Sequence, residues 1–253
     1  MVMNAQARLG LLCLLGLLSS CSKGSLDAID LDATSLPTGL MAHYTFDEGA
    51  GTAIVDHSGN KRDGVLLGGQ WISDGAFAGA LHLPGTVNDH ADVTPFPDAP
   101  KDFSVSAWAR TSAPTADEEG ALLSMENVFQ GGWELHLKRH VAGLGVHVGY
   151  WDTAAMAYVY LECYCLTYDR WTHVAFVRDS ATASLTVYVD GVADGSTAAP
   201  TPIAPGELQL HIGHWQQDYR DLNGDLDEVA IYDRALTADE VRELSIAPLS
   251  AQP

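Results

Sequence analysis

From Leu40 onward, apolar and polar residues alternate with the two-residue period of a β-strand. In 103–110, Phe, Val, Ala and Ala fall on one face and Ser, Ser, Trp and Arg on the other. Turn signals separate such runs, the clearest being Asp190-Gly191 after a Thr-Val-Tyr-Val segment. Many short strands joined by glycine-rich turns predict an all-β fold, a two-sheet antiparallel jelly-roll sandwich.

Further runs with a strand pattern are found along the rest of the chain. They cover residues 41–46, 80–83, 133–137, 144–150, 157–161, 171–178, 184–189, 208–213 and 226–232.

One short helix is expected near the C-terminus. The segment from Thr237 to Glu240 has the pattern of a capping box, in which the Thr hydroxyl accepts from the Glu backbone N–H and the Glu side chain reaches back. This pattern predicts a helix from Ala238 to Leu244, with Val241 and Leu244 on one side. Because helices do not alternate with strands elsewhere, an α/β fold is excluded.

The first twenty residues have the pattern of a signal peptide. They contain one charged residue, Arg8, and an apolar run of ten residues at 9–18, which is too short to span a bilayer. The following Leu18-Ser19-Ser20-Cys21 resembles the lipobox of bacterial lipoproteins. This resemblance implies acylation of Cys21 and, because Ser22 follows, export to the outer membrane. A plain secretory signal is the alternative.

These features predict four parts of the chain. Residues 1–20 are expected to be the signal, 21–39 a tether rich in Ser, Asp and Gly, 40–247 one globular domain, and 248–253 a tail. Alternatively, part of the tether forms a first strand.

The charge balance excludes one class of partner. The chain has 33 acidic residues against 13 Lys and Arg, a formal net charge of -20. Because nucleic-acid affinity comes largely from clustered cations on phosphates, no nucleic-acid partner is expected.

Seven segments occur in an order typical of one family. They are residues 44–49, 56–60, 79–83, 103–108, 171–175, 187–191 and 224–236. Together they resemble the laminin G-like jelly-roll domains of the concanavalin A-like lectin/glucanase superfamily, over about residues 40–246. The chain departs from the usual pattern at Leu222, where an aromatic residue is common. The resemblance implies a domain that recognises a carbohydrate or an extracellular protein.

A catalytic role is not expected. By resemblance, the glucanases of this superfamily carry Glu-x-Asp-x-x-Glu on one strand, whereas the nearest match here begins with Asp225 and ends with Ala230. Glycoside hydrolysis needs two facing carboxylates, and Glu134 and Glu162 have no strand-spaced acidic partner.

A structural calcium ion is the expected cofactor. By resemblance to calcium-bearing jelly rolls, Asp47, Asn60 and Asp227 are the predicted ligands, because the first and last strands of such a sandwich tend to be neighbours. The alternatives are that Asp47 is a turn residue, Asn60 a left-handed residue and Asp227 the partner of an arginine.

The histidines do not form a zinc motif along the sequence. His211 and His214 have no cysteine or acid at a useful spacing, and His136 and His147 are expected to decorate sheet faces. A site assembled from distant strands is left open.

Two cysteines remain after the signal and Cys21. In an exported protein, Cys163 and Cys165 are expected to form a local disulfide. Two free thiols, or a bond to another molecule, are the alternatives.

Aromatic residues near loops mark the expected contact site, because sugar faces stack on aromatic rings. Trp133, Tyr150, Trp151 with Asp152, and the stretch 214–220 are the candidates, and the predicted ligand-binding residues are Trp151, Asp152, Trp215, Gln217, Asp218 and Tyr219. The alternative for this stretch is an ordinary exposed loop. The sequence thus predicts a membrane-tethered, lectin-like module. The alternative is a protein-binding adhesion or envelope module, and a glycoside hydrolase is the third hypothesis.

Overall fold

A computed structural model describes residues 38–96, 100–114, 118–127, 131–141, 143–152, 154–200, 208–215 and 220–249. The expected signal and most of the tether, including Cys21, lie outside these ranges. So do three predicted contact residues, Gln217, Asp218 and Tyr219.

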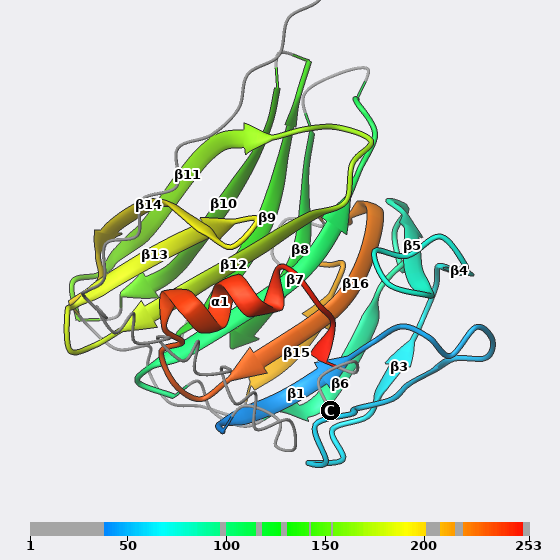
Figure 1. Cartoon of the computed structure of the whole chain (residues 1–253), viewed down its shortest axis with the longest axis horizontal. Coiled ribbons are helices and arrows are strands. Elements are labelled where there is room, and N and C mark those ends of the chain that lie inside the picture. The colour runs from blue at the N-terminus through cyan, green and yellow to red at the C-terminus, as the bar shows by residue number, and fades with distance from the viewer. Residues whose placement is uncertain are drawn as a thin grey trace, which may run out of the picture. The chain divides into compact units, whose positions relative to one another are not determined.

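The described residues form two antiparallel sheets of eight strands, which confirms the predicted jelly-roll sandwich (Figure 1). Sheet A contains β1 (Leu40–Tyr44), β4 (Gln70–Ile72), β5 (Ala80–Pro84), β7 (Phe103–Arg110), β12 (Thr172–Asp179), β13 (Ser184–Val189), β14 (Val192–Ala198) and β16 (Asn223–Tyr232). Sheet B contains β2 (Ala53–Ile54), β3 (Gly64–Leu66), β6 (Ala91–Phe96), β8 (Glu118–Asn127), β9 (Gly131–His140), β10 (Gly143–Asp152), β11 (Ala157–Leu166) and β15 (Leu208–Ile212).

The order of strands brings distant parts of the sequence together. Sheet A runs β14-β13-β12-β7-β16-β5-β4, with β1 paired to β16, so the first and last strands are neighbours as expected. Sheet B runs β11-β10-β9-β8-β15-β6-β3-β2. Four of its strands, the short β2 and β3 and the longer β6 and β8, do not appear among the runs expected from the sequence. Pro95 interrupts the pattern of β6, and both faces of β8 are buried over Ala121–Met125, so neither strand shows a clear alternation.

The main core lies between the two sheets and is built from their inward-facing side chains. Trp133 is only 2% exposed and packs between Phe103 and Phe176, with ring centroids 6.0 and 5.3 Å away. Tyr150 is 1% exposed on the neighbouring strand. The expectation that these two aromatic residues are candidates for ligand contact is therefore wrong, because strand alternation turns both into the core.

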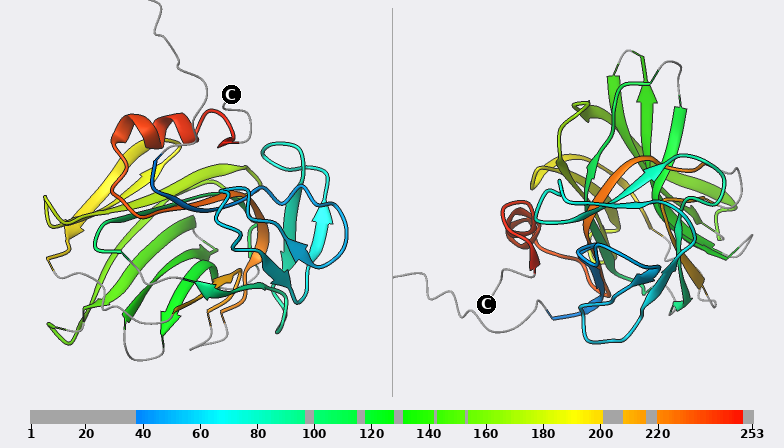
Figure 2. Two further views of the ribbon diagram at one scale, coloured as in Figure 1. Left: turned by 90° about the horizontal axis from the view of Figure 1, so that it is seen from below. Right: turned by 90° about the vertical axis from the view of Figure 1, so that its right-hand side faces the viewer.

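The outer side of sheet A is covered by the helix α1 (Ala238–Leu244), which lies against this sheet in both views of Figure 2. Its capping box is present as predicted: Thr237 accepts from the Glu240 backbone, and the Glu240 carboxylate accepts from the Thr237 backbone. Val241 and Leu244 are buried against the sheet, and Leu249, in the expected tail, is 2% exposed in the same cluster. No helix of the described residues is long and apolar enough to cross a lipid bilayer.

The tightest predicted turn is also present. Asp190 and Gly191 join β13 to β14 with φ angles of 48° and 76°, and Val189 pairs with Val192 across the turn. Both residues adopt left-handed conformations, which Asp tolerates and Gly favours.

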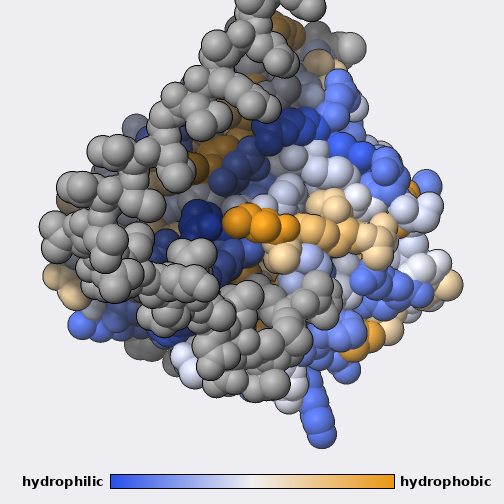
Figure 3. All heavy atoms as spheres, viewed as in Figure 1, coloured by the Kyte–Doolittle hydropathy of each residue, from blue (hydrophilic) through white to orange (hydrophobic). Residues whose placement is uncertain are grey.

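In the space-filling view of the α1 side, hydrophilic residues surround the apolar ones that stay exposed (Figure 3).

Candidate functional site

The outer side of sheet B carries a continuous group of polar and aromatic side chains, here called the polar face. Because alternate residues of a strand point to opposite sides, the neighbours of the core residues on β9, β10 and β11 project outward together. The polar face consists of Glu134, His136, Lys138, His147, Trp151, Tyr158, Tyr160 and Glu162, with Trp215 and Arg220 from the segment that follows β15.

His147 lies at the centre of the polar face and bridges two carboxylates. Its Nδ1 is 3.0 Å from a Glu162 oxygen on β11, and its Nε2 is 3.3 Å from a Glu134 oxygen on β9. The strand register sets this arrangement, because His147 pairs with Glu162 on one side and with His136 on the other. Two glutamates that are far apart in sequence therefore share one imidazole.

A tyrosine reaches across one strand to the buried Glu134. The Tyr158 hydroxyl on β11 donates to the Glu134 carboxylate on β9, passing over Gly149 of β10. A Cβ at Gly149 would lie 2.4 Å from the Tyr158 hydroxyl oxygen, so only glycine leaves room for the ring here. Glu134 is 6% exposed, and this bond helps to satisfy a carboxylate that has little access to water.

The rings on the polar face form a stepped array. Tyr158 and Tyr160 stack on His147 with interplanar angles of 10° and 14° and centroid distances of 5.9 and 5.6 Å. Tyr158 is 37% and Tyr160 54% exposed, and Trp151, the cross-strand partner of Tyr158, is 37% exposed. These rings present aromatic faces and hydroxyl groups to solvent, which is the combination that a sugar ring can contact.

Trp215 closes one side of the array. It packs edge-on against His136 at 5.1 Å, and the Arg220 guanidinium lies 4.8 Å from the centre of its indole ring. Arg220 is held in turn by an ion pair with Glu119. His136 is fully buried, and burial lowers its pKa well below the ordinary value, so this imidazole is neutral at physiological pH.

Most charges on the polar face are paired. Lys138 lies between Glu119 and Glu162. Burial opposes both charges, but the hydrogen bond between Lys138 and Glu162 prevails, so the pKa of the lysine is raised and that of the glutamate lowered. The polar face therefore offers fixed, charged hydrogen-bonding groups beside exposed rings.

The structure brings together two of the predicted contact residues and separates a third. Trp151 and Trp215 both belong to the polar face. Asp152 is 1% exposed, and its carboxylate accepts from the backbone N–H groups of Ala154 and Ala155, which shapes the turn after β10. The remaining three predicted residues lie outside the described ranges.

Two of the three predicted calcium ligands, Asp47 and Asp227, contact the loop before β5. Asp47 accepts from the Gly79 backbone at 2.7 Å and Asp227 from the Phe77 backbone at 2.9 Å. Asp227 is buried, its Oδ1 has no hydrogen-bond partner among the described residues, and burial together with nearby Glu228 and Asp47 raises its pKa to about 8.

Asn60 is placed differently. Its side-chain amide donates to the backbone carbonyls of Leu40 and Met41, and none of its hydrogen bonds within the described residues reaches Asp47 or Asp227. Asp225, two residues before Asp227, binds Arg110 and His82.

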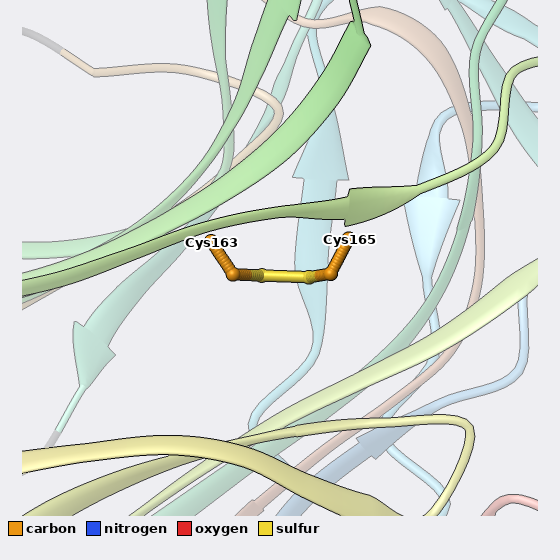
Figure 4. The surroundings of a disulfide bond; sticks show 2 residues. All are labelled: Cys163 and Cys165. Carbon is orange, nitrogen blue, oxygen red and sulfur yellow. A yellow bond between two sulfur atoms is a disulfide. The ribbon is translucent and has the colours of Figure 1, made fainter.

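Cys163 and Cys165 on β11 are joined by a disulfide, with Cα atoms 5.4 Å apart (Figure 4). The two sulfur atoms project together from one side of the strand. Tyr164, between them, is 58% exposed on the side of the polar face.

Sequence reasoning missed the pairing of Glu134 and Glu162, because each is isolated along the chain. A usable signal was the run of outward residues Tyr158, Tyr160 and Glu162 at a spacing of two on one strand. Their partners on β9 and β10 follow only from the register of the sheet.

Comparisons with known proteins show which family and which solved structures this architecture resembles. The model of a family described as the concanavalin A-like lectin/glucanases superfamily (Laminin_G_3) matches residues 84–242. A comparison with curated proteins found no match.

Several solved structures have a similar fold. The binding domain of Paraclostridial Mosquitocidal Protein 1 is 19% identical with a TM-score of 0.67, over 83% of this chain and 52% of that one. The binding domain of botulinum neurotoxin serotype G is 14% identical with a TM-score of 0.64, over 81% and 50%. The ligand-binding domain of botulinum neurotoxin serotype D, solved with N-acetylneuraminic acid, is 16% identical with a TM-score of 0.63, over 82% and 50%. The chain thus spans about half the length of these structures.

Proposed function

Because the chain belongs to the concanavalin A-like lectin/glucanases superfamily, we propose that it is a lectin-like binding module that recognises a carbohydrate through the polar face. Catalysis is not part of this proposal, since the two-carboxylate motif on β16 is incomplete and its acids Asp225 and Asp227 are engaged as described above.

One observation supports the polar face most strongly: exposed rings and paired charged groups lie side by side on the one outer sheet face that no described helix covers. Trp151, Tyr158 and Tyr160 are each more than a third exposed. A cluster of large exposed rings is typical of a surface that a partner covers on binding. His147 and Glu162 lie among these rings, where they can exchange hydrogen bonds with sugar hydroxyls.

A glycan array with matched tryptophan variants tests this proposal. Trp151→Ala and Trp215→Ala are expected to weaken glycan retention by about tenfold or more, since an aromatic anchor at a binding site commonly contributes more than about 1.4 kcal/mol. Trp171→Ala is the control, because this half-buried indole directly precedes β12 of sheet A and packs against Arg110, away from the polar face.

The array includes N-acetylneuraminic acid, since one protein of similar fold was solved with that ligand. An array without any hit, together with capture of a defined extracellular protein that depends on Trp151, would replace the carbohydrate by a protein ligand.

We also propose that the domain is exported and held at the outer membrane by acylation of Cys21. The support is the lipobox-like Leu18-Ser19-Ser20-Cys21 after a short apolar run. Two acyl chains suffice for stable anchoring. Cys21→Ser is expected to shift the protein from the membrane fraction to the soluble fraction, and an unchanged distribution would contradict the anchor.

We also propose a structural calcium ion at Asp47 and Asp227; the third predicted ligand, Asn60, is bonded to the backbone of β1. The chemistry of the donors fits a hard cation, because two carboxylates approach each other and the buried Asp227 Oδ1 has no described partner. When bound, the ion would neutralise their repulsion. A chelator is expected to lower the melting temperature, and calcium to restore it.

A further inference from the structure

Three histidines and two aspartates gather where β6 meets β15 and the segment after it. Asp92 on β6 pairs in register with His211 on β15, and the carboxylate oxygen lies 2.6 Å from His211 Nδ1. His90, two residues before Asp92, places its Nε2 3.6 Å from the same oxygen. His214 stacks on His90 with centroids 4.4 Å apart.

Two ring nitrogens in this cluster are buried and have no hydrogen-bond partner among the described residues. His90 is 8% and His211 3% exposed. His90 Nδ1 and His211 Nε2 have no hydrogen-bond partner within the described part of the chain. A buried polar atom without a partner costs about 1–3 kcal/mol, so both rings keep binding capacity that the described residues do not use. The other nitrogen of each ring, His90 Nε2 and His211 Nδ1, faces the Asp92 carboxylate.

The donor set has the composition of a transition-metal site. The donor atoms of His90, Asp92 and His211 all lie within 4.8 Å of one another. Ligands of a tetrahedral zinc ion are separated by about 3.3 Å, given Zn–N and Zn–O bonds of about 2.0–2.1 Å. His90 Nε2, at 3.6 Å from the Asp92 oxygen, is already close to this spacing, whereas His211 Nδ1, at 2.6 Å, would have to move slightly away from Asp92 to admit the ion. Two imidazoles and one carboxylate suit zinc and related divalent ions, whereas calcium requires oxygen donors.

We propose that His90, Asp92 and His211 bind one divalent transition-metal ion, for which zinc is the probe. The site is distinct from the calcium site proposed above and does not depend on the lectin function. An ion can reach it because the Asp92 side chain is 26% exposed.

The surroundings hold the ligands in place. Asp221 lies 2.7 Å from His214 Nδ1, and the His214 ring in turn supports the face of His90. Ser124 of β8 donates to the His214 backbone carbonyl at 2.8 Å. Such outer partners orient the imidazoles of a metal site. His214 and Asp221 also form a second group of donors together with His90, and the donor atoms of this group lie within 4.8 Å of one another. Because both groups need His90, one ion per chain is expected.

Calorimetric titration of the metal-free full chain with zinc, and the absorption spectrum of the cobalt-loaded protein, test the site. The wild type is expected to bind one zinc ion and to give a cobalt spectrum typical of nitrogen and oxygen ligands. His211→Ala and His90→Ala are expected to lower zinc affinity by at least about tenfold, as loss of even an outer partner does elsewhere. His57→Ala is the control, because His57 is exposed and lies outside the cluster.

Asp92→Asn guards against misfolding, because asparagine can keep the hydrogen bond to His211 while removing the charge that a metal needs. It is expected to retain the melting temperature of the metal-free wild type and to lose zinc affinity. An excess of calcium is expected not to displace zinc. Equal zinc binding by the wild type and by folded Asp92→Asn and His211→Ala, or the lack of any zinc binding by the wild type, would overturn the proposal.

Discussion

The Tyr158 hydroxyl donates to the Glu134 carboxylate across an intervening strand, and the two residues are joined over the bare backbone of Gly149. Tyr158 comes from β11 and Glu134 from β9, so this bond links three strands of the polar face. It keeps one oxygen of a buried carboxylate satisfied and holds an exposed ring over Gly149.

Gly149→Ala is expected to break this relationship. The added methyl group would lie 2.4–2.7 Å from three atoms of Tyr158, so the ring must move away from Glu134. We expect a loss of about 1–3 kcal/mol in the free energy of unfolding, measured in urea, together with weaker glycan binding. Gly143→Ala on the same strand is the control, because a Cβ there meets nothing within 4 Å and should change neither quantity.

Trp133 and Trp151 are predicted to behave in opposite ways although both lie in sheet B. Trp133→Ala opens a cavity between Phe103 and Phe176 and is expected to cost about 3–5 kcal/mol of stability. Trp151→Ala, at a 37% exposed position, is expected to cost less than about 1 kcal/mol. Chemical denaturation of both variants checks this. Similar losses would mean that Trp151 is structural, which would weaken its assignment to the binding site.

Asp227 predicts a fall in stability with rising pH. Its pKa is about 8 in the folded protein, chiefly because of burial, against about 4 in an unfolded chain. Between these values the folded state retains a proton that the unfolded state has lost, so its contribution to stability is lost as the pH rises from about 4 to about 8. Asp227→Asn is expected to flatten this part of the profile.

The measurement is urea unfolding in a chelating buffer across that pH range, with Asp194→Asn as the matched control at an exposed position of β14. A profile that Asp227→Asn leaves unchanged would argue that the buried carboxyl stays ionised. If the calcium proposal holds, adding calcium restores wild-type stability at the alkaline end, because the ion favours the charged form.

The capping box of α1 predicts the opposite dependence at acidic pH. The Arg234 guanidinium, with help from Thr237, lowers the pKa of Glu240 to about 2. The stabilisation that ionised Glu240 gives the folded state is complete above the unfolded pKa of about 4.3 and is lost as the pH falls toward 2. Thr237→Ala is expected to cost about 1 kcal/mol at neutral pH. Glu240→Gln should remove the acid-dependent part, whereas Glu243→Gln, exposed on the same helix, should not. Thermal unfolding at several acidic pH values gives the comparison.

Much of the fold was predictable from local patterns. The alternation in 103–110, the Asp190-Gly191 turn and the Thr237 capping box all appear as expected, since each depends on residues close in sequence. β6 and β8 were missed, since a proline and a fully buried run hide the alternation that marks a strand. The error at Trp133 has the same origin: its closeness to a turn says nothing about which side of the strand faces the second sheet.

By itself, the sequence determined the class of fold, the short helix, the acidic charge that disfavours nucleic acid, and the segments typical of the superfamily. Only the tertiary structure decided which side chains act together. Glu134, His147 and Glu162 meet because three antiparallel strands align in register, and His90, Asp92 and His211 meet because β15 returns to β6 after more than a hundred residues. The physical reason is that strand pairing is a long-range choice made by burial of the core, so the outward residues that it brings together leave no common pattern along the chain.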